Sequence, residues 1–215
     1  MENNKDSYTV LPLFSKPLYV SNCEPDDDLK IVLYKFIRNS NLKWTLDLKN
    51  GPLTNTNCRT LNLHVLEELE LKPLKKMILE RFNFFKNNVL KYTENEFKLT
   101  TSWITSTKKN FYSEYHNHSH SMYTGVLYFN QSPDQGGTSL INFEKRTFEP
   151  FISEGNLYNS TEWIIDPKPW QIIFFPSEVH HKVMQNNNKK VRHTLAFNFY
   201  PIGYLGEGDS CIKLL

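Results

Sequence analysis

Three histidines at alternate positions, within 114-EYHNHSHSMYTGVLYFN-130, are the residues best suited to chemistry. They are His116, His118 and His120, and the 215-residue chain contains seven histidines in all. Alternate side chains of an extended strand share a face, so two neighbouring imidazoles of this set can converge on one metal ion. The spacing does not choose between the pair His116 and His118 and the pair His118 and His120. Exposed polar histidines and hydrogen-bonded structural ones are the ordinary alternatives to a metal site.

A third ligand would have to come from elsewhere in the chain. The candidates are His180 and His181, within 175-FPSEVHHKV-183. They follow a strongly apolar segment, where a side chain can reach the mouth of a barrel. Three imidazole nitrogens suit iron, zinc, copper or nickel, and spacing alone does not select the metal.

Arg192, within 191-VRHTLAFNF-199, is a second chemical candidate. In a strand it shares a face with Thr194, and a guanidinium with a nearby hydroxyl matches a carboxylate. An arginine in an apolar strand is costly to bury without a partner. The alternative is an arginine at a strand end that reaches solvent. Beside a metal site, this pair indicates a bound carboxylate.

The elements that must position these residues differ between the two halves of the chain. The first part predicts an edge strand over 9–20, interrupted by prolines, and a helix after 26-DDD-28. It also predicts a strand over 44–53. Apolar residues at spacings of three and four predict a helix from Leu74 to Tyr92.

After residue 97, short segments rich in β-branched and aromatic residues alternate with turn-like stretches. The predicted strands are 97–105, 122–130, 138–143, 170–176 and 191–200. The pattern indicates a mainly β protein whose flanking helices pack outside a sandwich or barrel. We expect one domain over 1–215, in which 1–96 gives strand and helical support and 97–215 forms the core with the site.

Composition excludes several classes of protein. Hydrophobic residues make up 39% of the chain and the formal net charge is +2, so neither general disorder nor a nucleic-acid or anionic-membrane partner is expected. Three dispersed cysteines argue against a disulfide framework. The N-terminus lacks the apolar segment of a signal peptide, and no apolar run is long enough to span a membrane. A cytoplasmic protein is expected, in the host cytoplasm if the protein is viral.

The order of these motifs resembles the Fe(II)- and 2-oxoglutarate-dependent oxygenases. It is most similar to a branch found in bacteria and tailed phages and related to prolyl-4-hydroxylase-like enzymes. The shared motifs run through nearly the whole chain. They are 12-PLFSKPLY-19, Ser102-Trp103, His116-Asn117-His118, Thr124-Gly125, 136-GGTSLINF-143, Phe175-Pro176-Ser177, His181-Lys182-Val183, Arg192-His193-Thr194 and Phe197-Asn198.

The resemblance implies a double-stranded β-helix, a cupin-like jelly roll with helices on its outer face. It implies a hydroxylase that consumes 2-oxoglutarate and O2 at Fe(II), releases succinate and CO2, and uses ascorbate as a reductant. No catalytic group beyond the metal centre is implied. The implied residues are His116, His118 and His181 for the metal, Arg192, Thr194 and Tyr128 for 2-oxoglutarate, and Trp103, Asn198 and His120 for the pocket.

One departure from the family pattern concerns the metal. His118 stands where most of the superfamily has Asp or Glu, and Glu114 is the nearest carboxylate that could replace it. Two rival functions therefore stay open. One is an inactive jelly-roll binding module with a structural three-histidine metal site, and the other is a cupin-type metalloenzyme that needs no 2-oxoglutarate.

The prime substrate, a small molecule or a protein side chain, and the oligomeric state do not follow from the sequence. The aromatic and charged segment 144–163 is either a lid over the pocket or an ordinary surface connection.

Overall fold

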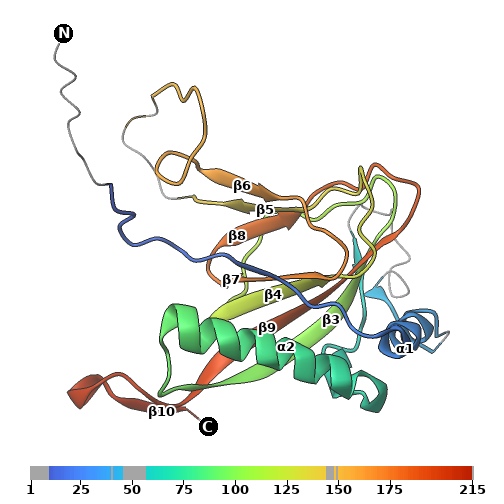
Figure 1. Cartoon of the computed structure of the whole chain (residues 1–215), viewed down its shortest axis with the longest axis horizontal. Coiled ribbons are helices and arrows are strands. Elements are labelled where there is room, and N and C mark those ends of the chain that lie inside the picture. Colours follow the sequence, from blue (N-terminus) through green and yellow to red (C-terminus); the bar gives the residue numbers. More distant parts are fainter. Residues whose placement is uncertain (1–9, 40, 46–56, 144–147, 149, 215) are drawn as a thin grey trace.

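The computed structural model describes residues 10–39, 41–45, 57–143, 148 and 150–214 (Figure 1). Strands dominate and all pair antiparallel. The strands are β1 Tyr19–Asn22, β2 Cys58–Arg59, β3 Glu96–Thr107, β4 Tyr123–Tyr128, β5 Thr138–Ile141, β6 Glu162–Ile165, β7 Gln171–Pro176, β8 His180–Val183, β9 Arg192–Leu205 and β10 Ile212–Leu214. The helices are α1 Asp27–Ile37, α2 Lys72–Phe84, the π-helix η4 Phe85–Leu90 and the 3-10 turns η2 Val65–Glu67, η3 Leu69–Leu71 and η5 Gly208–Ser210.

The strands form two sheets. The larger has the order β1-β7-β4-β9-β3-β2, with β10 paired to β9, and the smaller has the order β6-β5-β8. Leu140 of the small sheet packs with Tyr128 and Phe175 of the large one. These facing antiparallel sheets confirm the predicted mainly β, jelly-roll fold. Among the described helices, none has the length and apolar content that a membrane crossing requires.

Alternation along β9 separates the molecule into two chemical environments. Phe197 and Phe199 point to the face that helix α2 covers, where Phe82 stacks on Phe199 at 3.7 Å between ring centroids. Arg192, Thr194 and Asn198 occupy the opposite, inner face, because side chains of a strand alternate. In Figure 1, α2 crosses the large sheet on the side away from the small sheet. The helix layer therefore anchors the sheet whose inner face carries the polar residues.

The predicted helices are present, with one difference in the second. Helix α1 begins with the Asp26 side chain accepting the N–H of Leu29 at 2.8 Å. The segment predicted as one helix from Leu74 to Tyr92 is α2 followed by the π-helix η4. Val89 and Tyr92 are exposed rather than in the core. The widened turn lets the buried Lys86 ammonium donate to two carbonyls beyond it, so the apolar face does not continue.

Other elements differ more from the prediction. The first strand covers only Tyr19–Asn22, although it lies at the sheet edge as expected, paired with β7. Of the strand predicted over 44–53, residues 46–53 lie outside the described residues. Strands β6 and β8 were not predicted. Each has four residues, and neither shows a clear alternation of polar and apolar positions.

Gly125 of β4 gives room to two core rings, and alanine there should destabilise the fold. An added Cβ would overlap the Phe197 ring and would lie 2.8 Å from Cδ1 of Phe174. Gly125→Ala is expected to lower the free energy of unfolding by about 1–3 kcal/mol, the usual cost of overpacking. Urea denaturation measures this change, with Lys98→Ala at an exposed position of β3 as the control. Equal stability of both variants would show that the rings move aside freely.

Candidate metal centre

Three of the sequence-predicted histidines form one cluster. The segment before β4 extends the small sheet, because His116 and His181 form an antiparallel bridge with N–H···O distances of 3.0 and 2.8 Å. Directly opposed residues share a face, and their ring centroids are 4.4 Å apart. The His118 ring lies 5.0 Å from that of His181. One ligand atom from each of the three lies within 4.8 Å of the others.

The hydrogen bonds of the three rings fix their tautomers. Nδ1 of His116 lies 2.8 Å from the Glu114 carbonyl, and Nδ1 of His181 lies 3.0 Å from the Val179 carbonyl. Nδ1 of His118 lies 2.7 Å from the side-chain oxygen of Asn198. These oxygens only accept, so each Nδ1 carries the proton and each Nε2 keeps its lone pair. Metal-binding histidines have this arrangement, in which the second nitrogen donates to a fixed partner.

Burial keeps two of these imidazoles neutral. It lowers the pKa of His181 to about 3, with a further contribution from His116. Burial also lowers the pKa of His118, and the hydrogen bond to Asn198 opposes this shift only in part. A metal ligand must be deprotonated, so these two rings are in the binding form at neutral pH.

The donor set fits a transition metal. Imidazole nitrogens suit iron, nickel, copper and zinc. Among the described residues, the group that could hold an ion consists of His116, His118 and His181, and does not include Glu114. Glu114 contacts the cluster through its backbone carbonyl, which accepts the hydrogen bond from Nδ1 of His116. The described residues of the cluster therefore supply three imidazole nitrogens and no carboxylate.

The structure does not bring His120 or His180 into the cluster. The extended segment does not reach His120, which is exposed in a turn with φ of 60°. The expectation that His116, His118 and His120 share one face was therefore wrong at His120. His180 alternates away from His181 and contacts the ring of Phe143 at 4.8 Å.

Arg192 is buried at the start of β9. Its side chain is 1% exposed, and Nη1 donates to the carbonyls of Gln135, at 2.7 Å, and Gly136. Its Nε has no hydrogen-bond partner among the described residues. Burial lowers the pKa of Arg192 to about 10, so the guanidinium keeps its charge at neutral pH. A buried cation with an unused donor fits an anionic ligand.

Thr194 and Tyr128 share the inner face with Arg192. They are directly opposite each other in the pairing of β4 with β9, and both are buried. The Tyr128 hydroxyl lies 2.6 Å from that of Thr138 in the small sheet. Burial raises the pKa of Tyr128 to about 12, so it stays protonated. These residues give the guanidinium a polar but neutral surrounding.

Trp103 and Asn198 both contact His118, which gives them positions that the sequence left open. The Trp103 ring lies 5.4 Å from the His118 ring. Thr124 was missed as a site residue, although its hydroxyl lies 3.0 Å from Nδ1 of His118. The sequence feature that could have identified Thr124 is its place directly before Gly125, a glycine that the packing of β4 requires.

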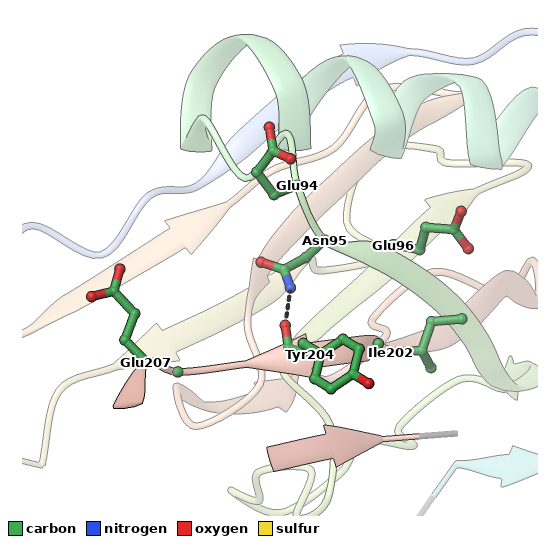
Figure 2. Close-up of a pocket in the computed structure, with 8 residues that line it drawn as sticks. Glu94, Asn95, Glu96, Ile202, Tyr204 and Glu207 are labelled. Atoms are coloured by element: carbon green, nitrogen blue, oxygen red, sulfur yellow. Dashed lines mark hydrogen bonds between the residues drawn. The ribbon is translucent and has the colours of Figure 1, made fainter. Parts of the chain in front are cut away.

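A separate hollow lies at the far end of β9. Its lining residues are Glu94, Asn95, Glu96, Ile202, Gly203, Tyr204, Gly206 and Glu207 (Figure 2). The Asn95 amide donates to the Tyr204 carbonyl at 2.9 Å. None of the clustered histidines lines it, so it is distinct from the metal centre.

His193 lies on the other face of β9 and makes stability depend on pH. Burial, with a smaller contribution from the charge of Arg38, lowers its pKa to about 4, whereas an unfolded histidine titrates near ~6.5. Between these values the unfolded chain binds a proton that the native state excludes. Stability is therefore complete above about pH 6.5 and falls as the pH drops toward 4. His118 and His181 contribute with the same sign.

The variant His193→Gln isolates this contribution. Its free energy of unfolding in urea should fall less between pH 7.5 and pH 5 than that of the wild type. Identical losses in both proteins would remove His193 as a source of acid sensitivity.

Known proteins resemble this chain in sequence and in fold. Residues 101–198 match the family described as "Putative 2OG-Fe(II) oxygenase". No curated protein sequence is significantly similar to the chain. The solved structures with a similar fold include HygX from Streptomyces hygroscopicus with nickel, 2-oxoglutarate and hygromycin B bound, at 11% identity and a TM-score of 0.58, covering 86% of this chain and 82% of that one.

Two prolyl hydroxylases share the fold as well. The Pseudomonas putida prolyl-4-hydroxylase is 16% identical, with a TM-score of 0.54 over 86% of this chain and 92% of that one. The Trichoplax adhaerens enzyme, solved with a hypoxia inducible factor peptide, is 14% identical, with a TM-score of 0.55 over 85% and 83%. The residues that match the 2OG-Fe(II) oxygenase family, 101–198, include His116, His118, His181 and Arg192.

Proposed function

We propose that this protein is an Fe(II)- and 2-oxoglutarate-dependent dioxygenase. The observation that carries the proposal is a cluster of three histidines in the same fold as a buried arginine with an unused Nε. In the proposal, His116, His118 and His181 hold the iron. Arg192, assisted by Thr194 and Tyr128, binds the far carboxylate of 2-oxoglutarate.

When bound, Fe(II) supplies the activation of O2 that couples decarboxylation of 2-oxoglutarate to succinate with oxidation of the prime substrate. The chain positions the reactants and excludes water. Nδ1 hydrogen bonds hold each imidazole in its ligating tautomer. The buried surroundings of Arg192 strengthen its attraction for a carboxylate, because few waters compete there. Ascorbate would keep the iron reduced.

The prime substrate is a small molecule or a protein side chain, and relatives are known with each. HygX was solved with hygromycin B and the Trichoplax enzyme with a peptide. We propose that the described residues 150–161 of the connection between β5 and β6 cover the substrate as a lid. Their exposed apolar side chains include those of Phe151 and Leu157. Such residues gain stability when a bound molecule covers them.

Two rival functions make different use of the arginine. A structural metal module and a cupin-type metalloenzyme that needs no 2-oxoglutarate give Arg192 no ligand. Both leave the buried cation with an unused donor, which is costly. The dioxygenase gives that donor a carboxylate partner and is therefore the better account.

The chain is proposed to act as one domain over 1–215. Its near-neutral charge gives no reason to expect a nucleic-acid partner, and a cytoplasmic location stays a prediction.

The deciding experiment is succinate formation from 2-oxoglutarate with Fe(II), O2 and ascorbate, alone and with pools of candidate substrates. Anaerobic and chelator-treated samples are the controls. Calorimetric binding of 2-oxoglutarate to the Ni(II)-loaded protein tests the cosubstrate site without turnover. Metal binding without 2-oxoglutarate binding or succinate would favour the rival functions.

A further inference from the structure

The three ligand histidines are not held in the same way. His116 and His181 each direct Nδ1 to the backbone carbonyl two residues earlier, that of Glu114 and that of Val179. These partners belong to the main chain and no side-chain substitution removes them. His118 instead directs Nδ1 to a side chain distant in sequence, the amide oxygen of Asn198, at 2.7 Å. Its orientation therefore depends on a residue that can be replaced.

Asn198 is itself oriented by its neighbours. Its Nδ2 donates to the Thr101 hydroxyl at 3.0 Å, which turns Oδ1 toward His118. The Thr124 hydroxyl donates to the same Oδ1 at 2.9 Å, and lies 2.8 Å from the buried Ser177 hydroxyl. Because Oδ1 has no proton, it can only accept from both neighbours.

The proton positions in this network are mutually consistent. The single proton of Thr124 goes to Asn198, so the Thr124 oxygen is free to accept from Ser177 and from His118 Nδ1–H, 3.0 Å away. Every contact of Nδ1 is thus with an acceptor. Nε2 is left with its lone pair, on the ring that also contacts Trp103.

We infer that Asn198, held by Thr101 and Thr124, is the positioning residue that sets the tautomer and ring orientation of His118. Asn198 does not touch the iron or the substrate and acts through His118 alone. The inference rests on the proposed function, since it gives His118 the role of a metal ligand. It also accounts for the polar Asn198 in an otherwise apolar stretch of β9, where it is 8% exposed.

The first test needs no metal. Nitrogen-15 NMR of histidine-labelled apo-protein at about pH 8, where an ordinary imidazole is neutral, distinguishes Nδ1–H from Nε2–H rings. We expect His118 to be the Nδ1–H tautomer in the wild type and in Asn198→Asp, which keeps an acceptor oxygen. Asn198→Leu should give a mixture of tautomers at His118 and leave His116 and His181 unchanged. A dominant Nε2–H tautomer at His118 in the wild type would overturn the inference.

The second test measures metal affinity by Co(II) titration in calorimetry. Asn198→Leu should weaken Co(II) binding about 10- to 100-fold, the usual effect of removing the partner of a ligand histidine, and Asn198→Asp should restore it. Asn95→Leu is the matched control, because it removes an asparagine bonded to the far end of β9 and should bind as the wild type does.

The outcomes separate the two proposals. Wild-type protein that shows the expected tautomer but binds no Co(II) would contradict the proposed function and leave the role of Asn198 intact. Asn198→Leu that is folded, with an unchanged tautomer and affinity, would contradict the role of Asn198 alone. If Asn198→Leu does not fold, a tautomer or an affinity in Asn198→Asp that departs from the wild type would contradict it.

Discussion

Removal of any one clustered imidazole is expected to abolish stoichiometric iron binding. The variants are His116→Ala, His118→Ala and His181→Ala. Each leaves two protein nitrogens where the structure places three within 4.8 Å of one another. The described part of the cluster has no carboxylate to take the empty position. Iron content after anaerobic dialysis against a weak chelator measures the loss.

The same region supplies matched controls. His120→Ala and His180→Ala should keep iron, because one side chain is exposed in a turn and the other contacts Phe143. His118→Asp should also keep iron, since it restores the commoner set of two histidines and one carboxylate and lowers the net charge of the site by one. Iron retained in His118→Ala but lost in His120→Ala would move the site two residues along the chain.

Loss of the arginine should remove most affinity for 2-oxoglutarate. Arg192→Met keeps much of the buried volume but not the charge or the unused Nε. Truncating one partner of a buried charge pair costs on the order of 2–5 kcal/mol, which corresponds to a loss of about 30-fold to a few thousand-fold in affinity. Calorimetric titration of 2-oxoglutarate into the Ni(II)-loaded variant measures it.

A control is needed because Arg192 also donates to the Gln135 and Gly136 carbonyls. Gln135→Ala loosens the same turn by removing the side-chain bonds of Gln135 to Ser132 and Lys190, and leaves the guanidinium in place. It should bind 2-oxoglutarate with nearly wild-type affinity. Equal losses in both variants would show that Arg192 acts only by holding the turn.

The sequence predicted the longer helices and strands better than it predicted the turns and the contacts between distant segments. Helix α1 and the longer strands β3, β4, β7 and β9 were visible because their apolar periods persist over several residues. Strand β5 was also predicted, although it has only four residues. Alternation allowed His116 to pair with His118 or His118 with His120, and only the family resemblance favoured the first pair. The turn at His120 could not be foreseen, because it needs a positive φ that no local glycine announces.

Other features depend on contacts between distant segments. The partnership of His118 with Asn198 joins residues far apart in the chain, and a single sequence records no such pairing. The antiparallel bridge between His116 and His181 is of the same kind. Strand β8 is recognisable only through its neighbours, since its four residues show no apolar alternation of their own.

The bridge between His116 and His181 has a consequence for the order of assembly. The two residues become neighbours only when β8 has docked beside the segment that precedes β4. In an unfolded chain only two of these three ligands, His116 and His118, lie close together. The complete set of three ligands would therefore exist only after this docking, and metal bound to it would stabilise the native state. Iron would then stabilise a structure that has already formed and would not direct its formation.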